Sequence, residues 1–246
     1  DPIMPKFPFH RLRQTMAHPL FAYASILVLQ LKVIWGAWHL WDLGHGDAAS
    51  YFGYATFWHK DFLANFAWSP LYTAYYGSIF FFSSEAYTIF ILHRLAIIFA
   101  VSAGVLAVMR RLMSAPLAWV AAAWWVILPA NFNVDYEVHL FAVIPYIAAW
   151  LVSLIKSGSM ARGWALGILL IASILVRNEI VLSLGFYSLV CLVMEIRYNE
   201  SWSLRHLRNL AVHYGAPLVF ALVIVAAFTW RNLFSQYPEL KDRRIT

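Results

Sequence analysis

Residues 86–111 read AYTIFILHRLAIIFAVSAGVLAVMRR. An α-helix needs roughly 20 predominantly apolar residues to cross the hydrocarbon core of a bilayer, and this stretch supplies them without a proline. The pair Arg110-Arg111 closes the stretch, and basic residues at the end of a span are typical of its cytoplasmic side. The segment therefore predicts a membrane-spanning helix that has His93 and Arg94 in its outer half.

The composition extends this interpretation to the whole chain. Of its 246 residues, 62% are hydrophobic and 12% are charged, whereas soluble domains average about 45–50% apolar and about 25% charged residues. We therefore expect an all-α membrane protein with about seven transmembrane helices, which form a single transmembrane domain over residues 1–246. The expected spans are Leu20–Trp41, Ala86–Met109, Pro116–Ala130, Leu140–Ile155, Gly163–Val176, Ile180–Ile196 and Tyr214–Trp230.

The basic residues predict the orientation of these spans. With the N-terminus inside, the short inner segments carry most lysines and arginines, whereas the outer segments before the tail carry only Lys60 and Arg177. This is the positive-inside distribution, and it indicates a multi-pass protein with a cytoplasmic N-terminus. We expect the membrane to be the bacterial inner membrane. Because topology accounts for the net charge of +6, we expect the lipid bilayer as a partner and no nucleic acid. The single cysteine, Cys191, excludes an intrachain disulfide.

The longest segment between spans is the first outer loop, residues 42–85. It holds a third of the chain's acidic residues: Asp42, Asp47, Asp61 and Glu85. Aromatic residues recur there every three or four positions, which is typical of amphipathic helices that lie on the bilayer surface with their rings among the headgroups. Pro70 is expected to break the helix before the chain turns back. Acids gathered in the longest loop of a membrane protein favour binding or chemistry there.

Two further outer segments are acidic. Residues 131–139 include Asp135 and Glu137, and a tight turn at residues 177–179 includes Glu179. We expect these segments to converge with the first outer loop on a single site.

Three short motifs carry a resemblance to a known family. They are GD at 46–47 with Tyr51 four residues after the aspartate, PLY at 70–72, and RNE at 177–179. In order and membrane side they resemble elements of multi-spanning glycosyltransferases with the GT-C fold, the superfamily of the protein mannosyltransferases and aminoarabinose transferases. Two positions depart from the family pattern: Ala48 stands where many relatives have a second acid, and Asn178 stands where they have proline.

The resemblance implies a donor that is a polyprenyl-phosphate sugar and a lipid, glycan or protein acceptor reached from the outer side. It also implies that the chain is the N-terminal part of a longer enzyme. The sequence begins with Asp1 rather than Met, and residues 231–246 form a polar stretch. We expect that stretch to begin an outer-side tail.

The chemistry of glycosyl transfer suggests roles for the outer residues. A carboxylate can take the acceptor's proton or stabilise an oxocarbenium-like transition state, and an arginine fork suits a phosphate leaving group. We expect Asp47 as general base, Asp135 as a second catalytic acid, and substrate contacts from Tyr51, Glu137, Arg177 and Glu179. Asp135 or Glu137 is alternatively a metal ligand. A divalent metal ion is a possible cofactor, and its candidate ligands are Asp47, Asp135, His45 and His139.

Each of these residues also has a structural interpretation. Asp47 could cap a surface helix, Asp135 and Glu137 could be solvated loop residues, and Arg177 could form an ion pair with Glu179. A transporter or lipid flippase is the alternative function, although that class usually places charges at the bilayer midplane and often shows inverted repeats. A non-catalytic membrane subunit would not need acids gathered on one side.

Overall fold

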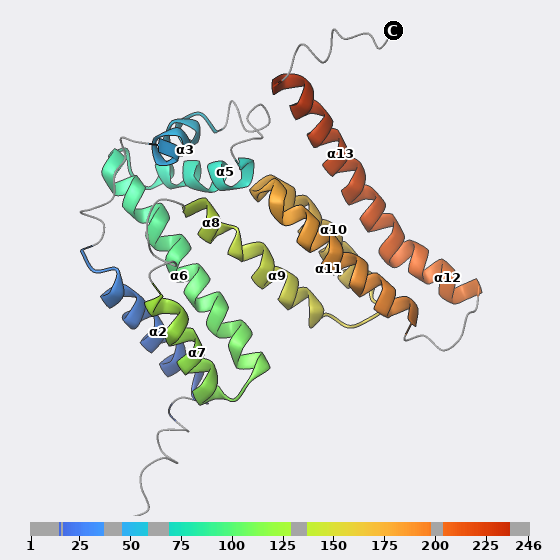
Figure 1. The fold of residues 1–246 in the computed structure, drawn as a ribbon, viewed down its shortest axis with the longest axis horizontal. Coiled ribbons are helices and arrows are strands. Elements are labelled where there is room, and N and C mark those ends of the chain that lie inside the picture. Colours follow the sequence, from blue (N-terminus) through green and yellow to red (C-terminus); the bar gives the residue numbers. More distant parts are fainter. Residues whose placement is uncertain are drawn as a thin grey trace, which may run out of the picture.

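The computed structural model describes residues 15, 17–36, 46–58, 69–128, 137–197 and 204–236 (Figure 1). Within these residues the fold is all-α, with no β-strand. The helices are α2 (Pro19–Val33), α3 (Gly46–Thr56), α5 (Pro70–Ser78), η3 (Ile79–Phe81), α6 (Ala86–Leu112), α7 (Ala115–Ile127), α8 (Glu137–Phe141), α9 (Val143–Ser153), α10 (Met160–Val176), α11 (Asn178–Arg197), α12 (Leu204–Leu210), η5 (Ala211–Gly215) and α13 (Ala216–Gln236).

Three of these helical segments are long and apolar enough to cross a membrane: Ala86–Leu112, Ile180–Arg197 and Arg208–Ala227. They indicate a multi-pass membrane protein. Four shorter apolar helices accompany them: Pro19–Val33, Ala115–Ile127, Val138–Ser153 and Met160–Val176. Each of the seven expected spans thus overlaps an apolar helix, although the first, Leu20–Trp41, meets a helix that ends at Val33. The described part of the chain confirms the all-α expectation.

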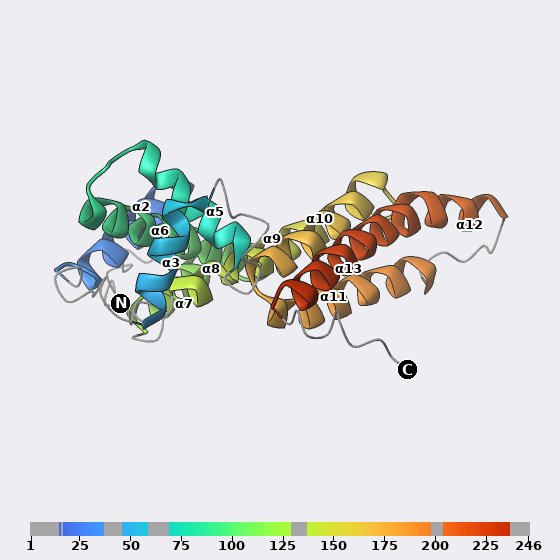
Figure 2. The same ribbon diagram turned by 90° about the horizontal axis from the view of Figure 1, so that it is seen from above.

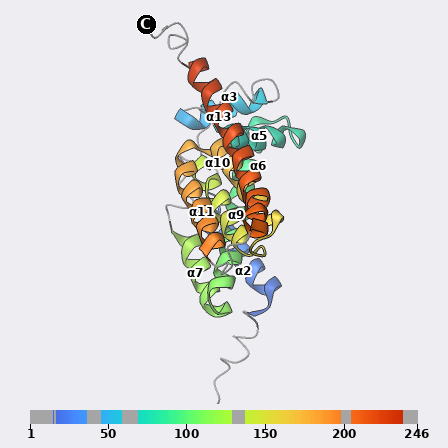
Figure 3. The ribbon, with the colours of Figure 1, turned by 90° about the vertical axis from the view of Figure 1, so that its right-hand side faces the viewer.

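The long helices form two groups (Figure 2). In one, α6 packs against α2 and α7; in the other, α10 packs against α11 and α13. Helix α9 contacts α6, α10 and α11 and so joins the groups. Helices α3 and α5 lie across the upper end of the bundle in Figure 1, whereas the α6–α7 and α9–α10 connections lie at the lower end. Viewed from the side, the same arrangement is narrow (Figure 3).

Two polar contacts fasten the first group. Buried Gln30 of α2 accepts a hydrogen bond from the Ser102 hydroxyl of α6 at 2.7 Å. At the lower end, Arg110 of α6 donates to the Ala17 carbonyl at 2.8 Å. These bonds fix the register of α2 on α6, because apolar side chains alone allow helices to slide.

The second group relies on glycines. A Cβ atom at Gly163 of α10 would lie 1.7 Å from the His213 carbonyl oxygen, and one at Gly167 would lie 2.8 Å from that of Pro217. The two glycines are one turn apart, the small-xxx-small spacing that lets backbones approach closely in membranes. Gly163 packs against the backbone of the π-helical segment η5, and Gly167 packs against the backbone at the start of α13.

The structure corrects several expectations about element bounds. The fourth apolar segment covers Val138–Ser153 rather than Leu140–Ile155, and a single turn residue, Ala142, separates α8 from α9 within it. The seventh helical segment begins at Leu204 rather than at Tyr214. Pro70 occupies the first turn of α5, where its missing N–H leaves no bond unmade. The expected helix before Pro70 lies in residues 59–68, outside the described residues.

Candidate functional site

The structure describes the side chains of four of the predicted site residues: Asp47, Tyr51, His139 and Arg177. His45 and Asp135 lie outside the described residues. Glu137 and Glu179 fall in the first turns of α8 and α11, but their side chains lie outside the described part.

Asp47 stands in the first turn of α3 and is exposed. A helix begins at Gly46, so the positive end of the helix dipole favours a carboxylate at this position. This placement agrees with the structural interpretation of Asp47 as a helix-terminal residue. It also leaves the carboxylate accessible, which a general base requires.

Helix α3 rests on α5 through aromatic rings. Tyr51, one turn after Asp47, meets Tyr72 edge to face with 5.0 Å between ring centroids. Phe52 meets Tyr76 in the same manner at 6.0 Å. Tyr51 is buried, with 7% of its surface exposed, so this ring lies inside the protein rather than among lipid headgroups. The three-and-four spacing that suggested bilayer anchoring also describes a helix packed on its neighbours.

The approach of α3 to α5 depends on a glycine. A Cβ atom at Gly77 would lie 2.0 Å from Cδ1 of Trp58 and 2.8 Å from the Ala55 carbonyl oxygen. Any larger residue would therefore push α3 away from α5.

Beneath α5, the buried residue His93 of α6 collects polar and aromatic contacts. The Tyr72 hydroxyl lies 3.1 Å from His93 Nε2, and the Tyr75 hydroxyl donates to the His93 carbonyl oxygen at 2.6 Å. The Tyr76 ring stacks on the imidazole. Burial raises the pKa of Tyr72 well above its usual value, so this phenol stays protonated and able to donate.

Arg94, the next residue of α6, is buried as well. It is 2% exposed, and its guanidinium carbon lies 4.1 Å from the centre of the Phe90 ring, a cation–π arrangement. A cation within a membrane-spanning helix is costly and marks a functional position by default. The sequence places Arg94 in the outer half of its span, and the structure puts it next to the aromatic cluster under the outer helices.

Arg177 and His139 come together from two different outer segments. Arg177 follows the last residue of α10, where its N–H bonds to the Ser173 carbonyl oxygen at 2.9 Å. Its Nη1 donates to Nε2 of His139, which lies on α8. This bond uses the imidazole lone pair that a metal ion would need. Among the described residues, no group of three or more His, Cys, Asp or Glu side chains could hold a metal ion.

Helix α5 connects these features. It contacts α3, which carries Asp47, and also α10, which ends at Val176, directly before Arg177. The beginning of α8, the end of α10 and the helices α3 and α5 therefore lie at the same end of the bundle (Figure 1). The described parts of the three outer segments thus lie at one end of the bundle, and the convergence of their acidic residues on a single site stays a prediction.

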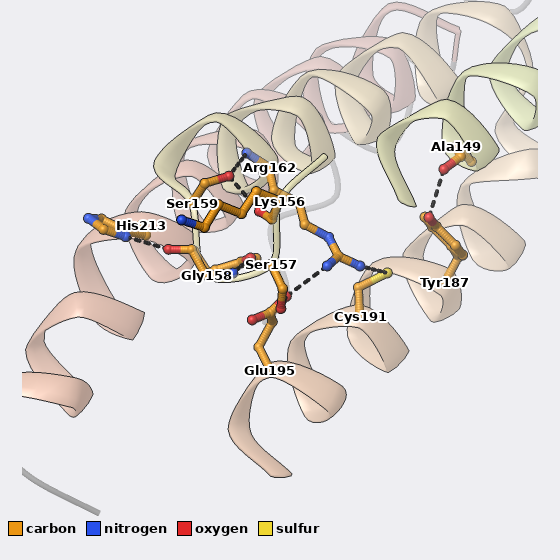
Figure 4. Close-up of polar contacts among 11 residues, drawn as sticks. Ala149, Lys156, Ser157, Gly158, Ser159, Arg162, Tyr187, Cys191, Glu195 and His213 are labelled. Atoms are coloured by element: carbon orange, nitrogen blue, oxygen red, sulfur yellow. Dashed lines mark hydrogen bonds and ion pairs between the residues drawn. The ribbon is translucent and has the colours of Figure 1, made fainter. Parts of the chain in front are cut away.

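Sequence reasoning missed a second polar cluster, at the opposite end (Figure 4). Arg162 of α10 forms an ion pair with Glu195 of α11 at 2.9 Å, and the Ser157 hydroxyl donates to the same carboxylate oxygen at 2.5 Å. The loop beside it is held twice: the Gly158 N–H donates to the Tyr214 hydroxyl at 3.0 Å, and His213 Nδ1 lies 2.9 Å from the Gly158 carbonyl oxygen. The sequence did contain one signal of this cluster: Glu195 is the single acidic residue within the expected apolar span Ile180–Ile196.

Comparisons of the chain with protein-family models, with curated proteins and with solved structures found no match. The fold and the apolar helices thus define an all-α protein of the multi-pass membrane class.

Proposed function

We propose that the protein is an integral membrane glycosyltransferase that moves a sugar from a polyprenyl-phosphate donor to an acceptor on the outer side of the bacterial inner membrane. The observation that carries the proposal is the placement of Asp47. Its carboxylate is exposed on a helix that packed aromatic rings hold at the same end of the bundle as Arg177.

In this proposal all seven apolar helices cross the membrane, and the N-terminus is cytoplasmic. The supporting observation is the separation of charge. Arg110, Arg111 and Lys156 lie at the α6–α7 and α9–α10 connections, opposite the end that carries α3 and α5 (Figure 1). Basic residues at one end are the signature of the cytoplasmic side.

Asp47 acts as the general base that takes the proton of the acceptor hydroxyl. Its exposure gives an acceptor access, and it stands in the first turn of α3, where the helix dipole favours a negative charge. The acceptor oxygen forms a bond to the anomeric carbon of the sugar while the bond from that carbon to the phosphate oxygen breaks, and polyprenyl phosphate leaves. Arg177 contacts this phosphate and stabilises its developing charge. The contact with His139 orients the guanidinium for this purpose.

The experiment measures sugar transfer in proteoliposomes with polyprenyl-phosphate donors that carry radiolabelled hexoses or pentoses. We expect Asp47→Asn to lower turnover about 10²–10⁴-fold, the usual contribution of a general base, without a change in thermal stability. Glu85→Gln is the matched control, because it removes another exposed carboxylate of the same loop and should leave turnover unchanged. Full activity of Asp47→Asn would remove this residue from the mechanism, and absence of transfer from every donor would refute the function.

Buried Arg94 supports a second candidate, a transporter or lipid flippase, since intramembrane cations often mark a substrate path. The same proteoliposomes separate the two functions. A transferase releases polyprenyl phosphate from its donor, whereas a flippase exposes intact labelled lipid on the opposite leaflet.

A further inference from the structure

Three tyrosines on one face of α5 contact a single residue of α6, His93. Tyr72, Tyr75 and Tyr76 occupy positions i, i+3 and i+4 of α5, which lie on one side of a helix. All three contact His93, one through its ring nitrogen, one through its backbone carbonyl oxygen and one through the face of its ring. The centroids of the stacked rings are 3.5 Å apart.

The hydrogen bond between Tyr72 and His93 has a defined direction. Nδ1 of His93 lies 3.4 Å from the Ile89 carbonyl oxygen, one turn earlier in α6. A carbonyl oxygen can only accept, so Nδ1 carries the proton and Nε2 accepts from the Tyr72 hydroxyl. Both side chains are fully buried, so water cannot replace the bond if either partner is removed.

The same tyrosines carry the contact to α3. Tyr72 packs on Tyr51, and Tyr76 packs on Phe52. Asp47 lies one turn before Tyr51, so the position of its carboxylate follows the position of these rings. A continuous series of contacts thus leads from α6 through α5 to the first turn of α3.

We propose that His93 is a positioning residue, which holds the Asp47 carboxylate in place through Tyr72 and Tyr51. The inference rests on the proposed function, because it takes Asp47 to be the general base. The placement of α3 itself can be measured without any enzymatic assay. His93 itself is covered by α5 and does not reach the exposed surface.

The experiment measures the distance between two spin labels in the full chain reconstituted in nanodiscs. The labels are attached at Thr56→Cys on α3 and Leu182→Cys on α11, both exposed positions, in a Cys191→Ser background. We expect Tyr72→Phe and His93→Phe to broaden the distance distribution, because each removes one partner of the bond while keeping an aromatic ring. His93→Gln, whose amide oxygen can accept in the place of Nε2, should restore a narrow distribution.

Tyr187→Phe is the matched control. It removes a hydroxyl that donates to the Ala149 carbonyl oxygen at 2.7 Å, between α11 and α9 and away from α3, and should leave the distribution narrow. In the transfer assay, Tyr72→Phe and His93→Phe should lower kcat about 10–100-fold, the scale of a small misplacement of a reacting group, with KM for the donor little changed. His93→Gln should recover most of the loss.

A narrow distribution in both phenylalanine variants would overturn the proposal, whatever their activity. A broadened distribution with undiminished kcat would overturn it too, because α3 would then move without consequence for the reaction. Broadening in a protein that transfers no sugar would refute the proposed function and still show that His93 places α3. If His93→Phe does not fold, Tyr72→Phe decides the question, since it removes a single oxygen atom.

Discussion

The two ends of the helix bundle differ in the exposure of their carboxylates. At the end near the α9–α10 connection, the charged pair is buried: Glu195 is 3% exposed and Arg162 is 13% exposed. At the other end, the carboxylate-bearing Asp47 is exposed. Aromatic rings and the His93 imidazole pack beneath its helix, and buried Arg94 lies beside them over the Phe90 ring. In a buried ion pair the two charges neutralise each other and are not accessible to a substrate. An exposed carboxylate on a helix that is packed firmly against its neighbours is accessible to one. We infer a structural role for the pair of Arg162 and Glu195, and we propose the chemistry at the end that carries Asp47.

The largest effect on stability is expected at the buried pair. Glu195→Ala would leave Arg162 charged and largely buried without its partner, which costs about 3–5 kcal/mol. Denaturant unfolding in detergent micelles measures this change. The double variant Glu195→Leu/Arg162→Met should recover most of the loss, because it removes both charges together. A stability of Glu195→Ala within about 0.5 kcal/mol of wild type would contradict the structural role.

A smaller loss is expected where α10 receives the π-helical segment. Gly163→Ala would place a methyl group 1.7 Å from the His213 carbonyl oxygen, and backbone would have to move, at a cost of about 1–3 kcal/mol. Gly185→Ala is the matched control on α11, since its methyl group would meet nothing nearer than Leu170 at 4.0 Å. The same unfolding measurement applies, and equal stability of the two variants would show that the close approach is not needed.

The sequence allows prediction of the helices better than of the contacts between them. The expected span Ala86–Met109 corresponds to α6, Ala86–Leu112, and Gly163–Val176 corresponds to α10, Met160–Val176. Apolar runs are local properties of the chain, and helices must satisfy their backbone hydrogen bonds internally in lipid. The positions of these two helices therefore follow from the apolar runs to within about three residues at each end.

The residues that join the elements could not be found in this way. Arg162 and Glu195 are 33 positions apart, and Tyr72 and His93 are 21 apart, so nothing in their local sequence pairs them. The same limit applies to Tyr51, whose spacing is compatible with both lipid and protein surroundings. The described parts of the outer segments lie at one end of the bundle, but the convergence of their acidic residues on one site stays a prediction. Sequence reasoning missed the aromatic layer that packs beneath α3.

The smallest effect is expected at the N-terminus of α6. There the exposed carboxylate of Glu85 has a structural role, in contrast to the role proposed for Asp47. Glu85 caps this helix: its carboxylate accepts from the Thr88 hydroxyl and, at 2.8 Å, from the Thr88 N–H. These bonds lower the pKa of Glu85 below its ordinary value of 4.5, so the ionised form is the one that caps. The stabilisation is therefore complete above the ordinary carboxyl pKa and is lost as the pH falls through the lowered folded value. As the pH falls through that range, hydrogen exchange of the Thr88 amide should become faster in the wild type than in Glu85→Gln. The glutamine is the control because its amide oxygen accepts the same bond without titrating. Parallel pH profiles of the exchange rate in the two proteins would show that the cap does not depend on charge.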